Sequence, residues 1–171
     1  MRKTVLFLAV GLVMTPLLAP SHGQAQFLLG VQGSYSQGPS EDVRSEPGVG
    51  VRAAFPVGRA RWGLELSASA DLFMPDCGSG DCSYFGLNAN AAYRHERPGR
   101  GVTPYVGSGI HYRHVEVEIG DEEILERGEG LNALVGAEFL PGRNARPFVE
   151  ARYEWMMDLR NQYVVTVGVL F

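Results

Sequence analysis

The stretch from Trp62 to Met74 reads WGLELSASADLFM and alternates apolar with polar residues at almost every step. Its even-numbered positions carry tryptophan, leucine, alanine and methionine. Its odd-numbered positions carry glycine, glutamate, serine and aspartate, apart from Phe73. Successive side chains of a β-strand point to opposite faces, so this alternation predicts a strand with one apolar and one polar face.

The same alternation recurs along the chain, and helical periodicity is almost absent after residue 27. The predicted strands cover residues 27–36, 48–55, 62–74, 85–94, 102–119, 131–140, 149–155 and 162–171. Eight such strands joined by turns favour an all-β fold, an eight-stranded antiparallel up-and-down barrel.

The composition narrows the class of protein. Of 171 residues 45% are apolar and 20% charged, which is too apolar for intrinsic disorder, and two cysteines are too few for a disulfide scaffold. Mean hydropathy is only -0.06, because the alternation averages an apolar face with a polar one. Glycine is unusually frequent, with 22 residues, against a usual frequency of about 7%.

The first residues are typical of a secretory signal peptide. Arg2 and Lys3 precede a mostly apolar stretch over residues 4–19, and GQA at 23–25 fits a cleavage site. A retained membrane anchor is the alternative, but the apolar run is short and ends at Pro20. We expect a cleaved signal peptide over residues 1–25 and an exported barrel domain over 26–171.

The two cysteines, Cys77 and Cys82, flank a short segment of glycine, serine and aspartate. Outside the cytoplasm thiols can oxidise, so we predict one structural disulfide that closes a tight loop. A metal site is the alternative, but two thiols without a nearby histidine supply only half of the usual zinc ligands. We expect neither a metal nor a cofactor.

Two kinds of barrel fit the alternation: a soluble lipocalin-like barrel with apolar residues inside, and a membrane barrel with apolar residues outside. The glycines share the polar parity of their strands, as a crowded, narrow interior requires, and they include positions 63, 86, 107, 109, 136 and 168. The apolar parity carries aromatic residues near the strand ends, at positions 62, 93, 112, 139, 153, 155, 163 and 171. Aromatic girdles at both ends of an apolar band favour the membrane barrel.

The connections between strands differ in length and charge. Those over residues 56–61, 96–101 and 141–146 are short and carry six arginines and one acid. Those over residues 37–47, 75–82 and 120–130 are longer or contain the cysteine pair, and they carry ten acids and two arginines. Short periplasmic turns and long external loops alternate in this way in outer-membrane barrels.

Four segments resemble the small eight-stranded outer-membrane β-barrels typified by the transmembrane domain of outer membrane protein A and by the OmpX and opacity-type proteins. They are PYVGSGI at 104–110, GLNALVGAEF at 130–139, RPFVEARY at 146–153 and YVVTVGVLF at 163–171. The resemblance implies localisation in the cell outer membrane of a Gram-negative type. It also implies an assembly signal read by the barrel assembly machinery, formed by Tyr163, Val165, Val167, Val169 and Phe171. Val169 stands where the family often has an aromatic residue.

A barrel of eight strands is just wide enough to be filled by its own side chains. The charges predicted to face inward are Arg52, Glu65, Asp71, Arg94, Arg113, Glu138, Glu150, Arg152 and Glu154. Four positive charges face five negative ones, and the arginine fork suits several carboxylates at once, which favours a paired structural network over an ion channel.

A lipid A-modifying barrel enzyme is the main alternative function. The lipid A deacylases carry a His-x-Ser pair, whereas the four histidines here precede Gln24, Arg97, Arg113 and Glu116 by two residues. His111 and His114 cannot share a metal on one strand, because their side chains point to opposite faces. We expect His111 to face the interior and His114 to lie above the membrane, with no catalytic residue.

An acidic run at positions 116, 118, 121, 122, 123, 126 and 129 is expected to lie largely in an external loop. It lacks the ligand spacing of a calcium loop, so a solvated loop is favoured over divalent-cation binding or a calcium bridge to lipopolysaccharide. This acidic exterior disfavours nucleic acid as a partner. The sequence favours a monomeric, non-catalytic barrel among outer-membrane lipid and lipopolysaccharide, with a structural, adhesive or surface-protective role; a soluble lipocalin-like lipid binder is a further alternative.

Overall fold

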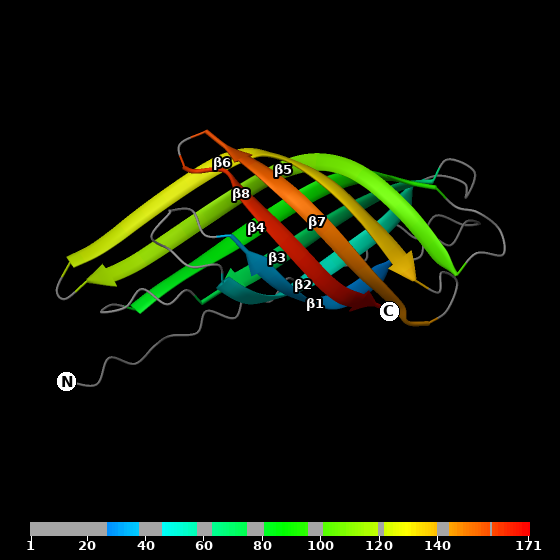
Figure 1. Ribbon diagram of the computed structural model, residues 1–171, viewed down its shortest axis with the longest axis horizontal. Coiled ribbons are helices and arrows are strands. Elements are labelled where there is room, and N and C mark those ends of the chain that lie inside the picture. The colour runs from blue at the N-terminus through cyan, green and yellow to red at the C-terminus, as the bar shows by residue number, and fades with distance from the viewer. Residues whose placement is uncertain are drawn as a thin grey trace, which may run out of the picture.

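The protein is a closed barrel of eight antiparallel strands in the computed structural model, and β1 pairs with β8 to complete the ring (Figure 1). The strands are β1 (Leu28–Ser36), β2 (Glu46–Val57), β3 (Leu64–Phe73), β4 (Asp81–Arg94), β5 (Val102–Ile119), β6 (Glu122–Phe139), β7 (Arg146–Met156) and β8 (Gln162–Leu170). The predicted all-β barrel with eight strands is therefore confirmed.

The structure describes residues 27–37, 46–57, 63–74, 81–95, 101–119, 122–139, 144–157 and 159–171, with the backbone alone at 81–82, 117–119 and 122–124. Within these ranges no helix is long and apolar enough to cross a membrane. The predicted signal peptide, Cys77 and the side chain of Cys82 lie outside the described part.

The strands are strongly tilted, as their register shows. Starting from Met156 and stepping from partner to partner through all eight strands, the path returns to β7 at Arg146, ten residues from its start. A closed sheet links this stagger to strand tilt and barrel diameter, and eight strands enclose only a narrow interior. The interior must therefore be filled by side chains.

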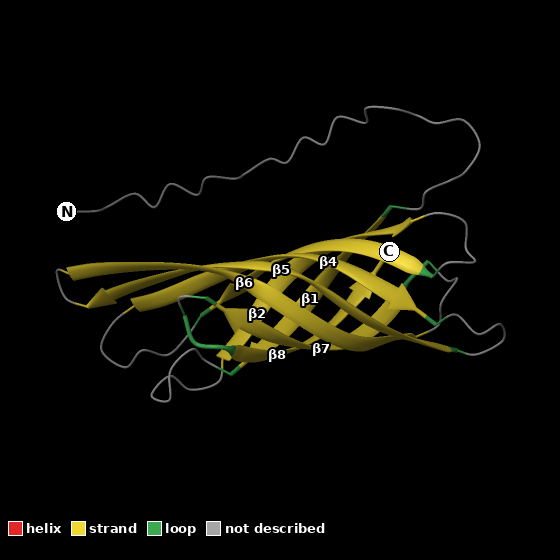
Figure 2. Ribbon diagram, turned by 90° about the horizontal axis from the view of Figure 1, so that it is seen from above, coloured by secondary structure: helices red, strands yellow, loops and turns green. Residues whose placement is uncertain are grey.

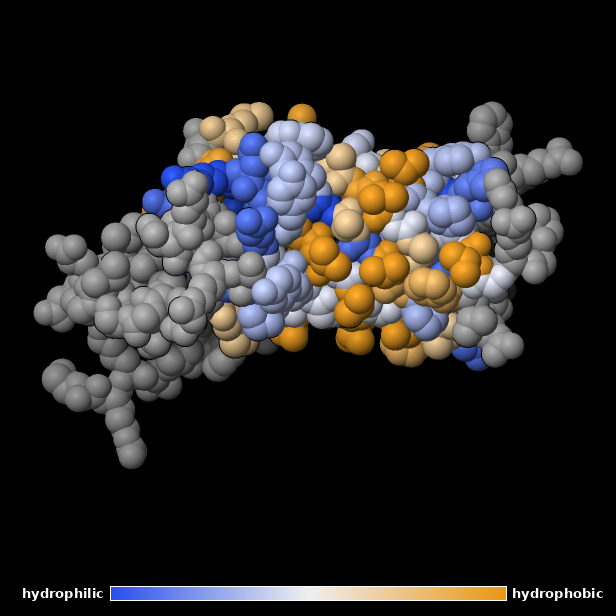
Figure 3. Space-filling view, in the orientation of Figure 1, coloured by the Kyte–Doolittle hydropathy of each residue, from blue (hydrophilic) through white to orange (hydrophobic). Residues whose placement is uncertain are grey.

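The two faces of the sheet separate polar from apolar residues as the alternation predicts. On β3, Glu65 and Asp71 point inward and are buried, whereas Leu66 and Leu72 point outward and are exposed. Figure 3 shows apolar residues gathered across the middle of the outer surface. Most described glycines face inward; Gly33 is an exception, because it lies on the outward parity of β1 between Val31 and Tyr35.

Aromatic side chains form two groups on the outer surface. At the end where the described chain begins and ends they are Phe27, Phe55, Tyr93, Phe139 and Phe171. At the opposite end they are Tyr35, Phe85, Tyr112, Tyr153, Trp155 and Tyr163. The rings contact one another, for example Tyr153 and Tyr163 across β7 and β8 with centroids 4.6 Å apart. The apolar band between these two girdles defines the zone suited to a bilayer core. Trp62 lies outside the described residues.

The acidic segment differs from the prediction of a loop over residues 120–130. β6 begins at Glu122 rather than at residue 131, and β5 and β6 pair without interruption up to Ile119 and Glu122. The prediction was wrong because the segment lacks an apolar alternation, while backbone pairing along β5 is sufficient to extend the hairpin. Smaller differences are the early starts of β2 and β4, at Glu46 and Asp81.

We predict that Gly168→Val destabilises the barrel, whereas Gly33→Val does not. A Cβ at Gly168 would lie 2.6 Å from the Val31 carbonyl oxygen and 2.7 Å from the Phe148 ring, but a Cβ at Gly33 would meet nothing closer than 4.0 Å. The expected loss for Gly168→Val is about 1–3 kcal/mol. Urea unfolding from detergent micelles, followed by tryptophan fluorescence, measures the difference. Equal unfolding midpoints for the two variants would contradict the packing argument.

Candidate functional site: a filled lumen and a protruding sheet

The end of the barrel toward the β5–β6 hairpin is called the upper end below, and the opposite end the lower end. Glu154 on β7 is the centre of an upper cluster of charges inside the barrel. Its carboxylate accepts hydrogen bonds from Arg113 at 3.0 Å and from Arg152 at 2.8 Å, and Gln162 on β8 donates to it as well. His111 Nε2 lies 3.1 Å from the same carboxylate, and its Nδ1 is 2.8 Å from the Asn88 amide oxygen. Strands β5, β7 and β8 are thus joined at one carboxylate, and β4 is linked to it through His111.

Arg152 extends this cluster downward along β7. It lies 3.4 Å from Glu150 and 3.6 Å from Asp71 on β3. Glu150 also accepts hydrogen bonds from Arg52 at 2.8 Å and from the Tyr105 hydroxyl at 3.1 Å. Arg152 serves three acceptors, and Arg52, which also donates to the Ser67 hydroxyl, serves two, as the planar guanidinium fork allows.

A lower cluster lies toward the end of the barrel at which the described chain begins and ends. Arg94 on β4 pairs with Glu65 on β3 and with Glu138 on β6, and Arg146 on β7 lies 3.7 Å from Glu138. Arg94, Glu65 and Glu138 are all buried. At the lower end of the lumen, Arg94 thus joins its own strand, β4, to β3 and β6.

An apolar layer separates the two clusters. It consists of Leu28, Ala54, Phe148 and Leu170 on one side of the lumen and Ala92, Tyr105 and Leu134 on the other. On β7, Phe148 stands between the inward-facing Arg146 and Glu150, and its ring lies 4.9 Å from the Arg52 guanidinium carbon. Water and ions passing through the lumen would have to cross this layer, in which the Tyr105 hydroxyl is already bonded to Glu150.

The structure places all nine predicted lumenal charges inside the barrel, each with an ion pair. It brings them together in two groups rather than one. Sequence reasoning missed Arg146, which was expected in a turn, and Glu46, which was expected to precede its strand. It also gave no role to Gln32, Ser34 and Gln162, although their inward parity was visible in the sequence; Gln32 and Ser34 both donate to Asp71.

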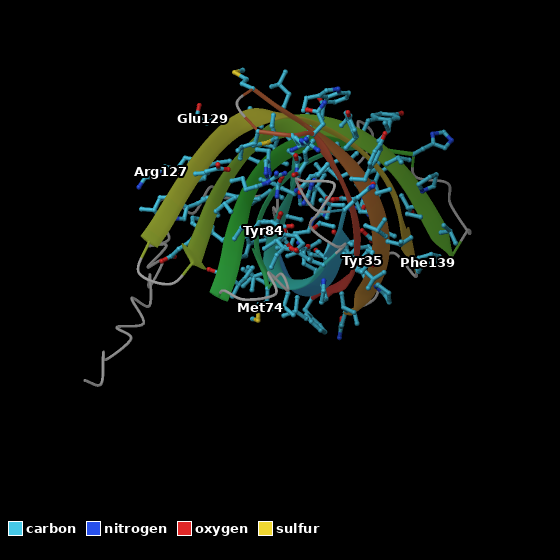
Figure 4. The ribbon with its side chains drawn as sticks, turned by 60° about the vertical axis from the view of Figure 1, so that its left-hand side comes forward. Tyr35, Met74, Tyr84, Arg127, Glu129 and Phe139 are labelled. Carbon is cyan, nitrogen blue, oxygen red and sulfur yellow. The ribbon has the colours of Figure 1, made fainter. Side chains whose placement is uncertain are left out.

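The upper end of the lumen is closed by rings. Phe73 and Tyr84 stack with centroids 4.5 Å apart, and Val164 completes this cluster. Figure 4 shows Tyr84 inside the mouth of the barrel. The lumen is thus occupied from end to end by described side chains.

Strands β4, β5 and β6 continue beyond this mouth as a protruding sheet (Figures 1 and 2). Pairing of β6 with β7 starts only at Gly130 and Met156, and the Glu129 carbonyl oxygen accepts a further hydrogen bond from the Met157 amide. Among the described strands, residues 122–128 of β6 therefore pair with β5 alone. On the outer face of this sheet lie Glu116, Arg127 and Glu129, with Arg127 and Glu129 exposed (Figure 4). The protruding sheet therefore offers a free strand edge and an acidic face.

The remaining predicted residues occupy defined places. His111 is buried in the lumen, and His114 lies on the outer face, 5.6 Å from the Phe85 ring. The residues of the predicted assembly signal, Tyr163, Val165, Val167, Val169 and Phe171, share the outward parity of the C-terminal segment. In the described part of the chain, no group of three or more His, Cys, Asp or Glu side chains is placed to hold a metal ion.

The family model for the outer membrane protein beta-barrel domain matches residues 5–171. The chain belongs to this family. Its closed antiparallel barrel, apolar belt and aromatic girdles are those of an outer-membrane protein. A search of curated proteins found no match to the chain.

Several solved outer-membrane barrels share the fold. Neisserial surface protein A is 14% identical, with a TM-score of 0.67 over 84% of this chain and 95% of that chain. The N-terminal barrel domain of Pseudomonas aeruginosa OprF is 14% identical, with a TM-score of 0.60 over 86% and 100%. Ail, the attachment invasion locus protein of Yersinia pestis, is 14% identical, with a TM-score of 0.55 over 85% and 96%. At such identities the likeness shows the fold alone.

We predict that Glu154→Ala lowers the stability of the barrel strongly. The substitution leaves the buried Arg113 and Arg152 without their shared carboxylate, and removing one partner of a buried pair costs about 3–5 kcal/mol. Urea unfolding of the purified protein in micelles measures this loss. The control is Glu129→Ala on the exposed face, which should change stability by less than about 0.5 kcal/mol. Similar losses for both variants would show that the lumenal cluster does not stabilise the fold.

Proposed function

We propose that this outer-membrane protein is a non-catalytic adhesin-like surface protein: its barrel is an anchor, and its protruding β4–β5–β6 sheet binds a partner outside the cell. The observation that carries the proposal is the continuation of β5 and β6 up to Ile119 and Glu122, well past the end of β7 at Met156. A barrel that only filled a membrane would need no such extension.

The orientation of the barrel supports an external position for the sheet. Phe27 and Phe171, where the described part of the chain begins and ends, lie at the end of the barrel opposite the protruding sheet, and outer-membrane barrels have short periplasmic turns and longer extracellular segments. Export would begin with the signal peptide over residues 1–25, and the outward residues Tyr163 to Phe171 would be read during assembly. Under the same orientation the predicted disulfide between Cys77 and Cys82 would close an external loop.

The protruding sheet has the physical properties of a binding surface. Residues 122–128 of β6 present backbone groups that no second described strand pairs, and an exposed edge can pair with a strand of another chain. Residues 114–129 contain seven acids and one arginine, which favours a basic partner and disfavours nucleic acid. Two proteins with a similar barrel are named for surface exposure and for attachment: Neisserial surface protein A and Ail.

The lumen supports an anchor rather than a pore or an enzyme. Its charges are paired in two clusters, and the apolar layer with Phe148 and Leu134 lies between them. His111, the buried histidine, contacts Asn88 and Glu154, neither of which supplies a hydroxyl or thiol nucleophile. The exposed apolar belt disfavours a soluble lipid carrier, because such a carrier turns its apolar residues inward. We propose a monomer surrounded by lipid and lipopolysaccharide.

We predict that shortening the hairpin abolishes binding without unfolding the barrel. Val115 and Glu126 are directly opposed, so residues 116–125 can be replaced by Asn-Gly, which closes a two-residue hairpin. Nanodisc-embedded protein is tested by biolayer interferometry against a panel of secreted basic proteins, with acidic proteins of similar size as controls. The wild type should bind basic members at least ten-fold more tightly than the shortened variant.

A matched variant separates edge pairing from charge. Glu116→Gln, Glu126→Gln and Glu129→Gln together keep the hairpin length but remove three negative charges. This variant should retain part of the binding and lose its salt dependence, since surface charge attraction is screened by salt. Folding of each variant is checked by the faster migration of unheated samples in SDS gels. Equal binding by the wild type and the shortened variant would refute the adhesive role.

We predict that the purified wild-type protein forms no large, stable conductance steps in planar bilayers. The physical reason is the apolar layer around Phe148 together with the paired charges on both sides of it. A general porin added to the same bilayers shows that insertion and recording work. Regular single-channel steps from the purified protein would contradict a filled lumen.

A further inference from the structure

Glu46 is the one lumenal carboxylate that lacks a compensating charge among the described residues. It is the first residue of β2 and lies at the upper mouth, where its relative exposure is only 2%. Both of its carboxylate oxygens lack a hydrogen-bond partner. An ionised carboxylate in this state is costly, because burial removes its hydration and nothing replaces it.

The other lumenal acids show what Glu46 is missing. Glu65, Asp71, Glu138, Glu150 and Glu154 each have at least one arginine within 3.6 Å. Arg113 lies near the mouth, with its guanidinium carbon 5.7 Å from the centre of the Tyr84 ring. Arg113 is already paired with Glu154 at 3.0 Å, so its charge is offset there. Among the described residues, no separate cation therefore pairs with an ionised Glu46.

Two hydroxyl oxygens lie beside this carboxylate. Ser36 is directly opposite Glu46 in the pairing of β1 with β2, and both side chains are buried on the inward face. The Ser36 hydroxyl is hydrogen-bonded to the Tyr84 hydroxyl, and Tyr84 is close enough to Glu46 for electrostatic coupling. A hydrogen bond between two hydroxyls uses one proton and leaves lone pairs on both oxygens. The mouth thus gathers a carboxylate and two neutral oxygen acceptors.

We propose that the upper mouth of the barrel binds a hard divalent cation of the calcium class, with Glu46 as the charged ligand and the Ser36 and Tyr84 hydroxyls as neutral ligands. Calcium is a hard cation that takes oxygen ligands, carboxylates among them, and water completes the coordination shell. Water can satisfy the hydrogen bonds of Glu46, but its charge is neutralised only by a proton or by a cation, and these two compete for the carboxylate. The site is empty in this structure.

A single protein carboxylate implies a weak site. Dissociation constants of about 10⁻⁴–10⁻³ M are typical of calcium sites in extracellular modules, and we expect a value in or above this range. The bound cation would join β1, β2 and β4 at the mouth, next to the Phe73–Tyr84 ring stack. Binding should therefore stabilise the upper end of the barrel, independently of any adhesive role of the protruding sheet.

The test uses the full-length mature protein in detergent micelles, with terbium and then calcium as probes. Terbium replaces calcium and luminesces when a nearby tyrosine is excited, so Tyr84 reports on occupancy of the mouth. The wild type should show saturable luminescence that millimolar calcium displaces. Glu46→Gln should weaken terbium binding at least ten-fold, whereas the control Glu129→Gln on the exposed outer face should bind as the wild type does. Equal binding by wild type and Glu46→Gln, or no saturable binding by the wild type, would overturn the proposal.

A second measurement covers the case in which terbium also binds elsewhere on the acidic exterior. Urea unfolding is compared in chelator and in 10 times the measured calcium dissociation constant. Saturation of one native-state site at that concentration corresponds to an eleven-fold change in the folding equilibrium. In chelator, Glu46→Gln should be at least as stable as the wild type, because it removes the unpaired charge. Calcium should then stabilise the wild type and Glu129→Gln but not Glu46→Gln; equal stabilisation of all three would overturn the site.

Discussion

Closure of the sheet by the pairing of β1 with β8 is the interaction on which the rest of the molecule depends. A backbone polar group without a partner in hydrocarbon costs several kcal/mol, so a sheet can span a bilayer only when it has no free edge. Closure of eight tilted strands also sets the circumference, and with it the narrow interior. The polar parity of every strand is then forced into a small volume, where glycine provides space and each charge requires a partner.

The lumen shows how this requirement is met. Arginines on β2, β4, β5 and β7 reach carboxylates on other strands, so the same side chains that fill the interior also bind the wall together. The apolar layer with Phe148 and Leu134 lies between the two charged clusters, and the Tyr105 hydroxyl within it is bonded to Glu150. Glu46 is the exception to this pairing, and it lies where the barrel meets the exterior.

Much of this arrangement could be predicted from period-two alternation, because parity alone decides which face of a strand a residue occupies. The inward position of Arg94 and Glu138 follows from parity, but their contact does not, since it depends on the register and tilt of strands distant in the sequence. The start of β6 was missed because residues 122–130 lack an apolar alternation; these residues are held by backbone pairing with β5 instead. Glu46 was missed because Pro47 resembles the end of a loop.

Because the stagger of the ring is fixed, segments inside and outside the barrel differ in how well they tolerate insertions and deletions. An added or deleted residue within the band between the aromatic girdles would shift one strand against both neighbours and reverse its faces. Beyond the mouth, residues 122–128 of β6 pair with β5 alone among the described strands, so changes in the length of the hairpin disturb a single pairing. A foreign peptide inserted between Ile119 and Glu122 would therefore leave the pairings of the ring in place, and the proposed orientation would display it outside the cell.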